Sequence, residues 1–220
     1  MPLLGTRGAA SSRGFGQFGG VKEPAPTVIG QVYGGGYYAG QISTSGNSIP
    51  THYLVVAPKA LGQANAKQWK TTNTSTAGTG SVLDGPTNSA NMNNALHPAA
   101  QFCETLSING YGDWYMPSLS ELEICYFNLK PSAILNDTST GSNLYAVPSR
   151  LSTYTSGNPP QTSAALFQTG GSEAFDPANY WSSTAFSTTN GWYQAFDNGL
   201  QSNAAKTSEL YVRAIRRVAI

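Results

Sequence analysis

Charged side chains are scarce in this sequence, and neither sign dominates. Its 220 residues hold 12 lysines and arginines against 11 aspartates and glutamates, for a formal net charge of +1. Proteins that grip nucleic acid or anionic lipid usually show a basic excess or stripe, because phosphate neutralisation supplies most of their affinity. The balance therefore argues against nucleic acid and membrane surfaces as partners.

Cysteine is also scarce, since only Cys103 and Cys125 are present. A small secreted scaffold that relies on disulfides would carry more cysteines in a chain so rich in loops. We therefore expect two free, largely buried thiols.

Long hydrophobic runs are missing as well. No run approaches the roughly 18 apolar residues that a spanning helix needs, so we expect no membrane insertion. The first 20 residues also lack the apolar stretch of a secretory signal peptide. The sequence thus indicates a protein that stays where it is made or leaves by another route.

Uncharged polar residues are abundant instead. The chain has 24 serines, 21 threonines and 16 asparagines beside 24 glycines and 13 prolines. These residues favour turns and local side-chain hydrogen bonds over regular helix. With 40% hydrophobic residues, the chain suits one packed, loop-rich domain that leans toward β-structure, with an arm attached.

The arm is expected at residues 1–27, ahead of a domain at 28–220. Residues 1–20 hold six glycines and no apolar stripe that could form a core. Pro24 and Pro26 then indicate a linker. One interpretation is a disordered tail. The other, which we favour, is an extended arm that docks on a partner through four anchors: Arg7, Arg13, Phe15 and Phe18.

Strands and helices follow in the domain. Residues 37–42 and 51–57 predict a hairpin-like pair of strands, and the polar residues 71–91 predict a loop. Pro98 predicts the start of a helix that stops before Asn109-Gly110. A second helix is expected to open with a capping box of Ser118 and Glu121 and to end before Pro131. Both cysteines then face the core.

A long loop and a small sheet are expected in the last third. Residues 132–179 have no steady periodicity, and loops of this length are more often functional than incidental. The strand-like pieces NYWSSTAF, GWYQAF and ELYVRAIRRV then predict a terminal antiparallel sheet, with turn signals at 188–191 and 196–199. The glycines at 34–36 predict a bulge or bend rather than a phosphate cradle.

Residues for catalysis or metal binding are few. His52 starts an apolar strand and His97 flanks a helix, so neither is a strong candidate for a general base. No zinc or calcium spacing is present. Spacing alone does not bring together the carboxylates that could serve glycoside hydrolysis, Asp137, Glu173, Asp176 and Asp197. We therefore expect no enzyme, no metal and no cofactor.

Three arginines lie near the end of the sequence, at positions 213, 216 and 217. On one continuous strand Arg213 and Arg217 would share a face with Tyr211 and Ile215, and Arg216 would point the other way. A solvated or salt-bridged sheet edge is favoured over an anion site.

Five blocks carry a resemblance to a known family. They are HPAAQFCETL (97–106), DWYMPSLSEL (113–122), YWSSTAF (180–186), GWYQAFDNG (191–199) and YVRAIRR (211–217). Their order and spacing resemble a domain family of phage tail-fibre-like proteins and of the C-terminus of collagen-like bacterial adhesins.

The resemblance implies an α+β, C-type-lectin-like fold with small antiparallel or mixed sheets, two short helices and a long loop region. It makes six residues framework positions: Trp114, Pro117, Leu122, Tyr180, Trp181 and Val212. The Glu-Pro-Asn, Gln-Pro-Asp and Trp-Asn-Asp signatures of calcium-dependent lectins are absent. Binding through calcium is therefore not expected.

The leading hypothesis is a phage virion protein, a fibre- or spike-like appendage on the particle surface whose lectin-like domain binds a host-surface glycan or protein. Its arm would dock on other virion proteins, and by analogy with fibres it would form a homotrimer. The binding residues expected from the long loop and the strands after it are Tyr154, Phe167, Phe175, Phe186, Tyr193, Asp197 and Asn198. Two alternatives are a decoration, neck or tail component without a receptor, and a bacterial surface adhesin.

Overall fold

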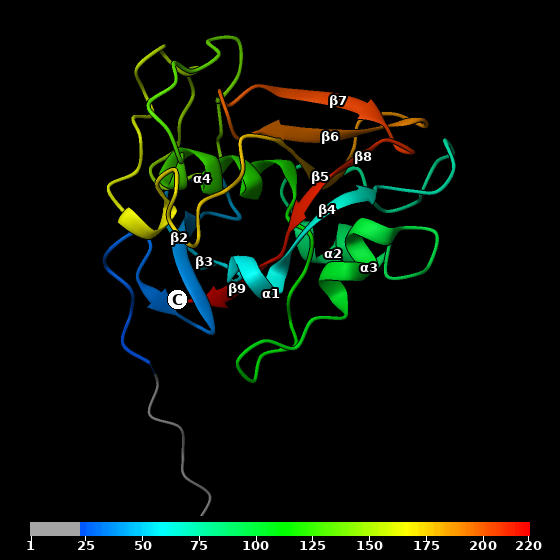
Figure 1. The fold of residues 1–220 in the computed structure, drawn as a ribbon, viewed down its shortest axis with the longest axis horizontal. Coiled ribbons are helices and arrows are strands. Elements are labelled where there is room, and N and C mark those ends of the chain that lie inside the picture. Colours follow the sequence, from blue (N-terminus) through cyan, green and yellow to red (C-terminus); the bar gives the residue numbers. More distant parts are fainter. Residues whose placement is uncertain (1–22) are drawn as a thin grey trace, which may run out of the picture.

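Two β-sheets and four α-helices make up the part of the chain that the structure describes, residues 23–220 of a computed structural model (Figure 1). The first sheet has the order β1-β2-β3-β9, with β1 (Val32–Tyr33), β2 (Gly36–Ile42), β3 (His52–Val56) and β9 (Ile215–Ala219). The second has the order β4-β8-β5-β6-β7, with β4 (Gln63–Gln68), β8 (Glu209–Arg213), β5 (Asn179–Ala185), β6 (Asn190–Ala195) and β7 (Gln201–Ala205). The expected α+β class is confirmed.

The expected hairpin is the pair β2 and β3, which runs antiparallel. Ahead of it, Gly34 and Gly35 form a two-residue turn between β1 and β2, at φ of 55° and 82°. Glycine reaches these positive values without steric cost. The glycine run is therefore a tight hairpin turn, which agrees with the expected bend.

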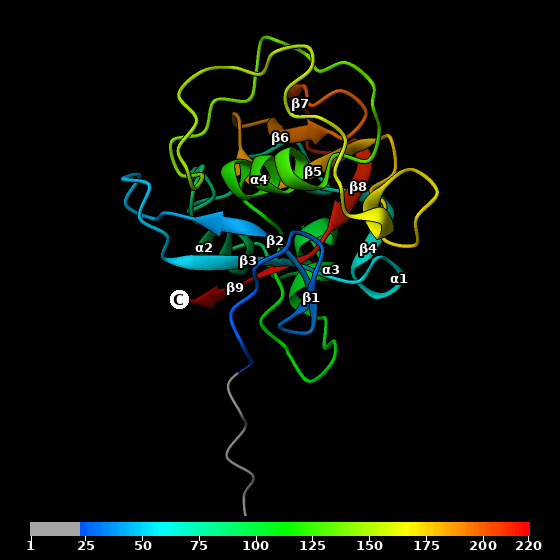
Figure 2. The same cartoon turned by 90° about the vertical axis from the view of Figure 1, so that its left-hand side faces the viewer.

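Both expected helices are present. α3 (Pro98–Glu104) begins at the predicted proline. α4 (Leu119–Leu129) opens with the predicted capping box, in which the backbone N–H of Ser118 donates to Oε2 of Glu121 at 2.8 Å. α4 contacts β2, β5 and β6, so it lies between the two sheets (Figure 2).

Two further helices were not predicted. α1 (Lys59–Gly62) leads into β4. α2 (Gly85–Ala90) lies inside the stretch expected to be loop, so that prediction was wrong for these residues. Asp84 caps α2 by accepting a hydrogen bond from the backbone N–H of Thr87 at 3.2 Å, and Pro86 stands in the first turn. Both are recognised start signals for a helix.

The end of the chain differs from the single strand expected there. The chain leaves the second sheet after Arg213 and enters the first at Ile215, with Ala214 between β8 and β9. β8 pairs with β5 in parallel, so the terminal sheet is mixed rather than antiparallel. β7 was also missed, because QSNAA contains none of the β-branched or aromatic residues that mark a strand.

The expected long loop between α4 and β5 is confirmed, since η1 (Ala165–Phe167) is its one helical turn. Part of it arches over α4 (Figure 2), whereas η1 packs beside the hairpin of β1 and β2, with 5.5 Å between the ring centroids of Phe167 and Tyr37. Lys130 anchors the loop from beneath, donating from Nζ to the carbonyl oxygens of Ile134 (2.5 Å) and Pro159 (3.2 Å).

Two hydrophobic clusters form the core, and the six framework residues are all buried in it or at its edge. Cys103 and Cys125 are free and fully buried, as expected. Burial raises the pKa of both thiols far above the usual range.

The chain enters the described part at Glu23, whose carboxylate accepts a hydrogen bond from the backbone N–H of Gly34 at 2.8 Å. Pro26 is buried as well, so the expected linker packs on the domain at its end. The four predicted anchors Arg7, Arg13, Phe15 and Phe18 lie outside the described residues.

Candidate functional site

Three of the seven expected binding residues belong to the packed interior. Tyr154 is 4% exposed, Phe167 0% and Phe175 2%. The Tyr154 hydroxyl donates to Oε1 of Glu123 at 2.7 Å, and the Phe175 ring stacks on Phe196 with 4.0 Å between centroids. These side chains hold the loop on the domain and offer little surface to a partner.

Phe186 lies on the surface and is 48% exposed. Its ring meets Trp192 edge to face, with 4.9 Å between centroids and 90° between planes. Neither ring belongs to the two hydrophobic clusters. Large aromatic side chains that are not needed for a core are a feature of binding surfaces.

Amide side chains lie next to this pair. Trp192 on β6 is directly opposite Asn203 on β7. Nδ2 of Asn190 donates to Oδ1 of Asn203 at 2.7 Å, which holds the two amides together. We call Phe186, Asn190, Trp192 and Asn203 the aromatic platform.

The other expected residues lie apart from the platform. Tyr193 follows Trp192 in the same strand and therefore points to the opposite face, where it contacts Trp181. Asp197 and Asn198 lie in the turn between β6 and β7, beside Asp137, whose backbone N–H donates to the carbonyl oxygen of Asn198 at 2.8 Å. The structure thus divides the predicted set among the core, the platform, the opposite face of β6 and a turn.

Three platform residues, Asn190, Trp192 and Asn203, were missing from the expected set, and Trp192 is the aromatic one among them. Its signal was present, because Tyr193 was expected in a strand and its neighbour must face the other way.

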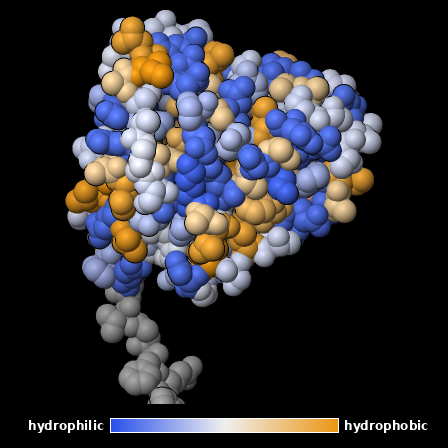
Figure 3. All heavy atoms as spheres, in the orientation of Figure 1, coloured by the Kyte–Doolittle hydropathy of each residue, from blue (hydrophilic) through white to orange (hydrophobic). Residues whose placement is uncertain are grey.

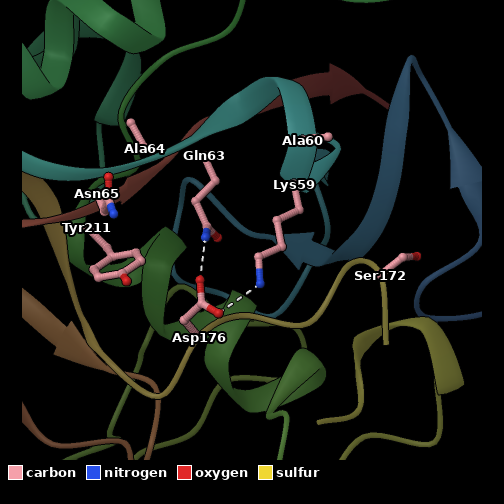
Figure 4. Close-up of a pocket in the computed structure, with 8 residues that line it drawn as sticks. All are labelled: Lys59, Ala60, Gln63, Ala64, Asn65, Ser172, Asp176 and Tyr211. Atoms are coloured by element: carbon pink, nitrogen blue, oxygen red, sulfur yellow. Dashed lines mark hydrogen bonds and ion pairs between the residues drawn. The ribbon is translucent and has the colours of Figure 1, made fainter. Parts of the chain in front are cut away.

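A second surface feature is a hollow of about 430 Å³ at the start of β4 (Figure 4). Its polar lining residues are Lys59, Gln63, Asn65, Ser172, Asp176 and Tyr211. Nζ of Lys59 and Nε2 of Gln63 donate to the two carboxylate oxygens of Asp176, at 2.8 and 2.7 Å. We call it the polar hollow.

An apolar hollow of about 380 Å³ adjoins it and shares Lys59 and Asp176. Its apolar lining comes from Pro131, Ile134, Ala174, Phe175 and Pro177. Phe175 therefore lines this hollow, although the residue is only 2% exposed.

The arginines are used internally. Arg213 pairs with Glu173 at 2.9 Å, Arg216 with Asp113 at 2.7 Å and Arg217 with Glu121 at 2.6 Å. The salt bridges are confirmed for all three, but the edge position holds only for Arg216 and Arg217 on β9, because Arg213 lies on the inner strand β8. The shared face for Arg213 and Arg217 was wrong, as was solvation of Arg213, which is 1% exposed, because the chain changes sheets at Ala214.

The histidines and the acidic residues also have structural contacts. Burial, with the nearby Lys70 and Lys206, lowers the pKa of His97 to about 4, and its ring lies within hydrogen-bond distance of Thr76 and Asn94. Burial and Arg217 lower the pKa of His52. Glu173 and Asp176 form ion pairs with Arg213 and Lys59. Within residues 23–220 no three His, Cys, Asp or Glu side chains converge as metal ligands.

Hydrophobic residues form separate small patches on the face shown in Figure 3, among hydrophilic ones. No described helix has the length and apolar character to cross a bilayer.

The fold and these surfaces define an α+β domain with two sheets, a helix between them, a long ordered loop and an exposed aromatic platform. The chain belongs to the Lcl C-terminal domain family, which its residues 62–216 match. This range includes all five blocks except the last residue of the fifth. No curated protein matches the sequence.

Proposed function

We propose that this protein is a phage virion protein, a fibre- or spike-like appendage that binds a receptor on the host surface. The aromatic platform is the observation that carries the proposal. Two large rings, Phe186 exposed and Trp192 partly buried, lie beside two fixed amides without belonging to either core. Aromatic rings give contact area at small entropic cost, and amides add directional hydrogen bonds.

Family membership and the resemblance to tail-fibre-like proteins support the same proposal. In it the domain is C-type-lectin-like and binds a glycan or a protein on the host without calcium. The chain enters the fold near β1, at the other end of the molecule from the platform on β6 and β7 (Figures 1 and 2). An arm at residues 1–27 would then hold the particle while the platform faces outward.

We also propose a homotrimer at the virion surface. A single platform is small, and binding by several linked copies raises the effective concentration of each later contact.

Binding of the fluorescently labelled full chain to a panel of intact bacterial strains tests this proposal. We expect saturable binding to some strains, unaffected by a calcium chelator, that Trp192→Ala abolishes. Because the ring lies outside the cores, we expect that variant to lose no more than about 1 kcal/mol of stability. Trp192→Phe should restore part of the binding.

Leu151→Ala is the matched control, because Leu151 is a hydrophobic residue that is 76% exposed and belongs to the long loop and not to the platform. Equal binding by the wild type, Trp192→Ala and Leu151→Ala would reject the platform as the receptor site. A folded chain that binds no strain would favour the alternative, a structural decoration, neck or tail component of the particle.

A further inference from the structure

The polar and apolar hollows are joined by one ion pair. Lys59 and Asp176 line both of them and lie 2.8 Å apart, with side chains 27% and 36% exposed. A molecule that occupied both hollows would therefore pass over one cation and one anion. Volumes of about 430 and 380 Å³ are each in the range of sites for small ligands.

The backbone is irregular at the rim of the polar hollow. Ala64 pairs with Val212 and Lys67 with Leu210, so two residues, Asn65 and Ala66, stand opposite the single Tyr211. This is a β-bulge, and bulges often re-aim side chains beside functional sites. Ala66 has a φ of 48°, a left-handed conformation that costs a residue other than glycine on the order of 1 kcal/mol. The strain is located where Asn65 and Tyr211 both line the hollow.

Polar groups in this hollow remain available to a ligand. Figure 4 shows hydrogen bonds only among Lys59, Gln63 and Asp176. Within residues 23–220 the side chains of Asn65, Ser172 and Tyr211 have no hydrogen bond to another residue, and all three line the hollow. One amide and two hydroxyls are thus free to donate and accept at one surface site.

From this arrangement we propose that the joined hollows bind an uncharged sugar that carries an acetamido group. The sugar hydroxyls bind Asn65, Ser172 and Tyr211 in the polar hollow. The acetamido carbonyl accepts from Lys59, its N–H donates to Asp176, and its methyl group enters the apolar hollow against Phe175 and Pro177.

Charge and polarity favour this class of ligand. A neutral amide has one donor and one acceptor, which complements an ammonium and a carboxylate held side by side. An anionic ligand would be attracted by Lys59 and repelled by Asp176 to a similar degree, because the two lie 2.8 Å apart. The apolar lining adds a preference for a methyl group over a hydroxyl, since burial of apolar surface is favourable.

This site goes beyond the proposed receptor function and does not depend on the platform. The polar hollow lies at β4 and β8, and the apolar hollow adjoins it at α1 and the long loop. The strands of the platform, β6 and β7, lie toward the opposite edge of the same sheet. Trp192→Ala should leave sugar binding in the hollows unchanged, which separates the failure of one proposal from the failure of the other.

The test is a titration of the full chain with N,N′-diacetylchitobiose, followed by calorimetry or by NMR shifts. Cellobiose is the matched ligand, because it has the same rings with hydroxyls in place of the acetamido groups. We expect saturable binding with a Kd of about 1 mM for the first sugar, and binding at least about tenfold weaker for cellobiose.

Two variants locate the site. Asn65→Ala and Tyr211→Phe each remove one ligand-binding group and should weaken binding of diacetylchitobiose by about five- to tenfold. The controls are Asn93→Ala and Tyr145→Phe, which remove an exposed asparagine amide and a partly buried tyrosine hydroxyl elsewhere. They should leave the Kd unchanged.

Three results would overturn the proposal. Equal affinity for the two sugars would remove the acetamido assignment. Equal affinity of Asn65→Ala, Tyr211→Phe and the controls would place the binding elsewhere. Absence of saturation by either sugar at about 20 mM would reject the site, since that concentration is far above the expected Kd.

Discussion

Arg150→Ala should destabilise the protein strongly, because it leaves a buried carboxylate without its cation. Glu123 on α4 is 0% exposed, and its carboxylate pairs with Arg150 and accepts hydrogen bonds from Asn143 (2.6 Å) and Tyr154 (2.7 Å). The Arg150 guanidinium also lies over the Phe127 ring, 3.9 Å from its centroid. These contacts fasten the long loop to α4.

The size of the effect follows from this burial. Removing one partner of a buried ion pair costs about 3 to 5 kcal/mol, whereas an exposed pair is worth no more than about 1 kcal/mol. The Arg150 side chain is 16% exposed, so water can partly replace it, and we expect the lower end, about 3 kcal/mol. Burial already raises the pKa of Glu123, and loss of Arg150 would raise it further. Protonation of Glu123 removes the unpaired buried charge in the variant. The difference in unfolding free energy between the wild type and Arg150→Ala should therefore become smaller as the pH falls.

Urea denaturation at pH 7 and pH 5 measures the unfolding free energies. Arg150→Met keeps the aliphatic stem over Phe127 and separates the loss of charge from the loss of packing. Adding Glu123→Gln to Arg150→Met should recover part of the stability, because no unpaired charge then remains buried at this position. A loss below about 1 kcal/mol for Arg150→Ala at pH 7 would refute this account of how the loop is held.

Three further predictions concern the core and the loops. The pKa of His97 is about 4 in the folded protein and 6.5 ordinarily, so as the pH falls the unfolded chain takes up a proton on His97 before the folded chain does. The unfolding free energy should therefore fall as the pH drops from 6.5 toward 4. In a pH series of urea melts, His97→Gln should flatten this decline. In the same assay Gly85→Ala should lower the unfolding free energy by at least about 2 kcal/mol, since the new Cβ would lie 2.0 Å from the carboxylate of Glu121, which caps α4. Gly80→Ala is the control and should be neutral, because its Cβ would have no neighbour within 4 Å. Cys103 and Cys125 should resist a thiol reagent in the native protein and react after unfolding, because burial raises the pKa of both thiols; rapid native reaction would contradict their burial.

Local signals in the sequence predicted those elements that local chemistry determines. The capping box of Ser118 and Glu121 forms within one turn of α4, and the prolines at 98 and 131 bound the two expected helices. The six framework residues were predicted from the family resemblance and not from local spacing, and the structure buries all of them.

Elements that depend on a distant partner could not be predicted. The sequence QANAKQ has weak strand propensity, and β4 exists because it pairs with β8, more than 130 residues later. The change of sheet at Ala214 likewise depends on pairing of β9 with β3. For this reason the arginines were assigned to one strand, although their carboxylate partners come from three different segments.

The candidate site was predicted only in part for the same reason. Composition correctly indicated aromatic residues in the last third of the chain, but it does not separate a packed ring from an exposed one. Phe167 and Phe186 have the same chemistry, and only tertiary packing buries the first and exposes the second. The polar hollow combines residues of α1, β4, β8 and the long loop, which no spacing along the chain brings together.

The most direct test of the central claim is competition for the host surface. Cells of a strain that binds the protein are incubated with excess full-length chain, and adsorption of the phage proposed to carry it is then measured. We predict that the wild-type chain slows adsorption and that Trp192→Ala, equally folded, does not. Unchanged adsorption in the presence of saturating wild-type protein would contradict a receptor-binding role for this domain.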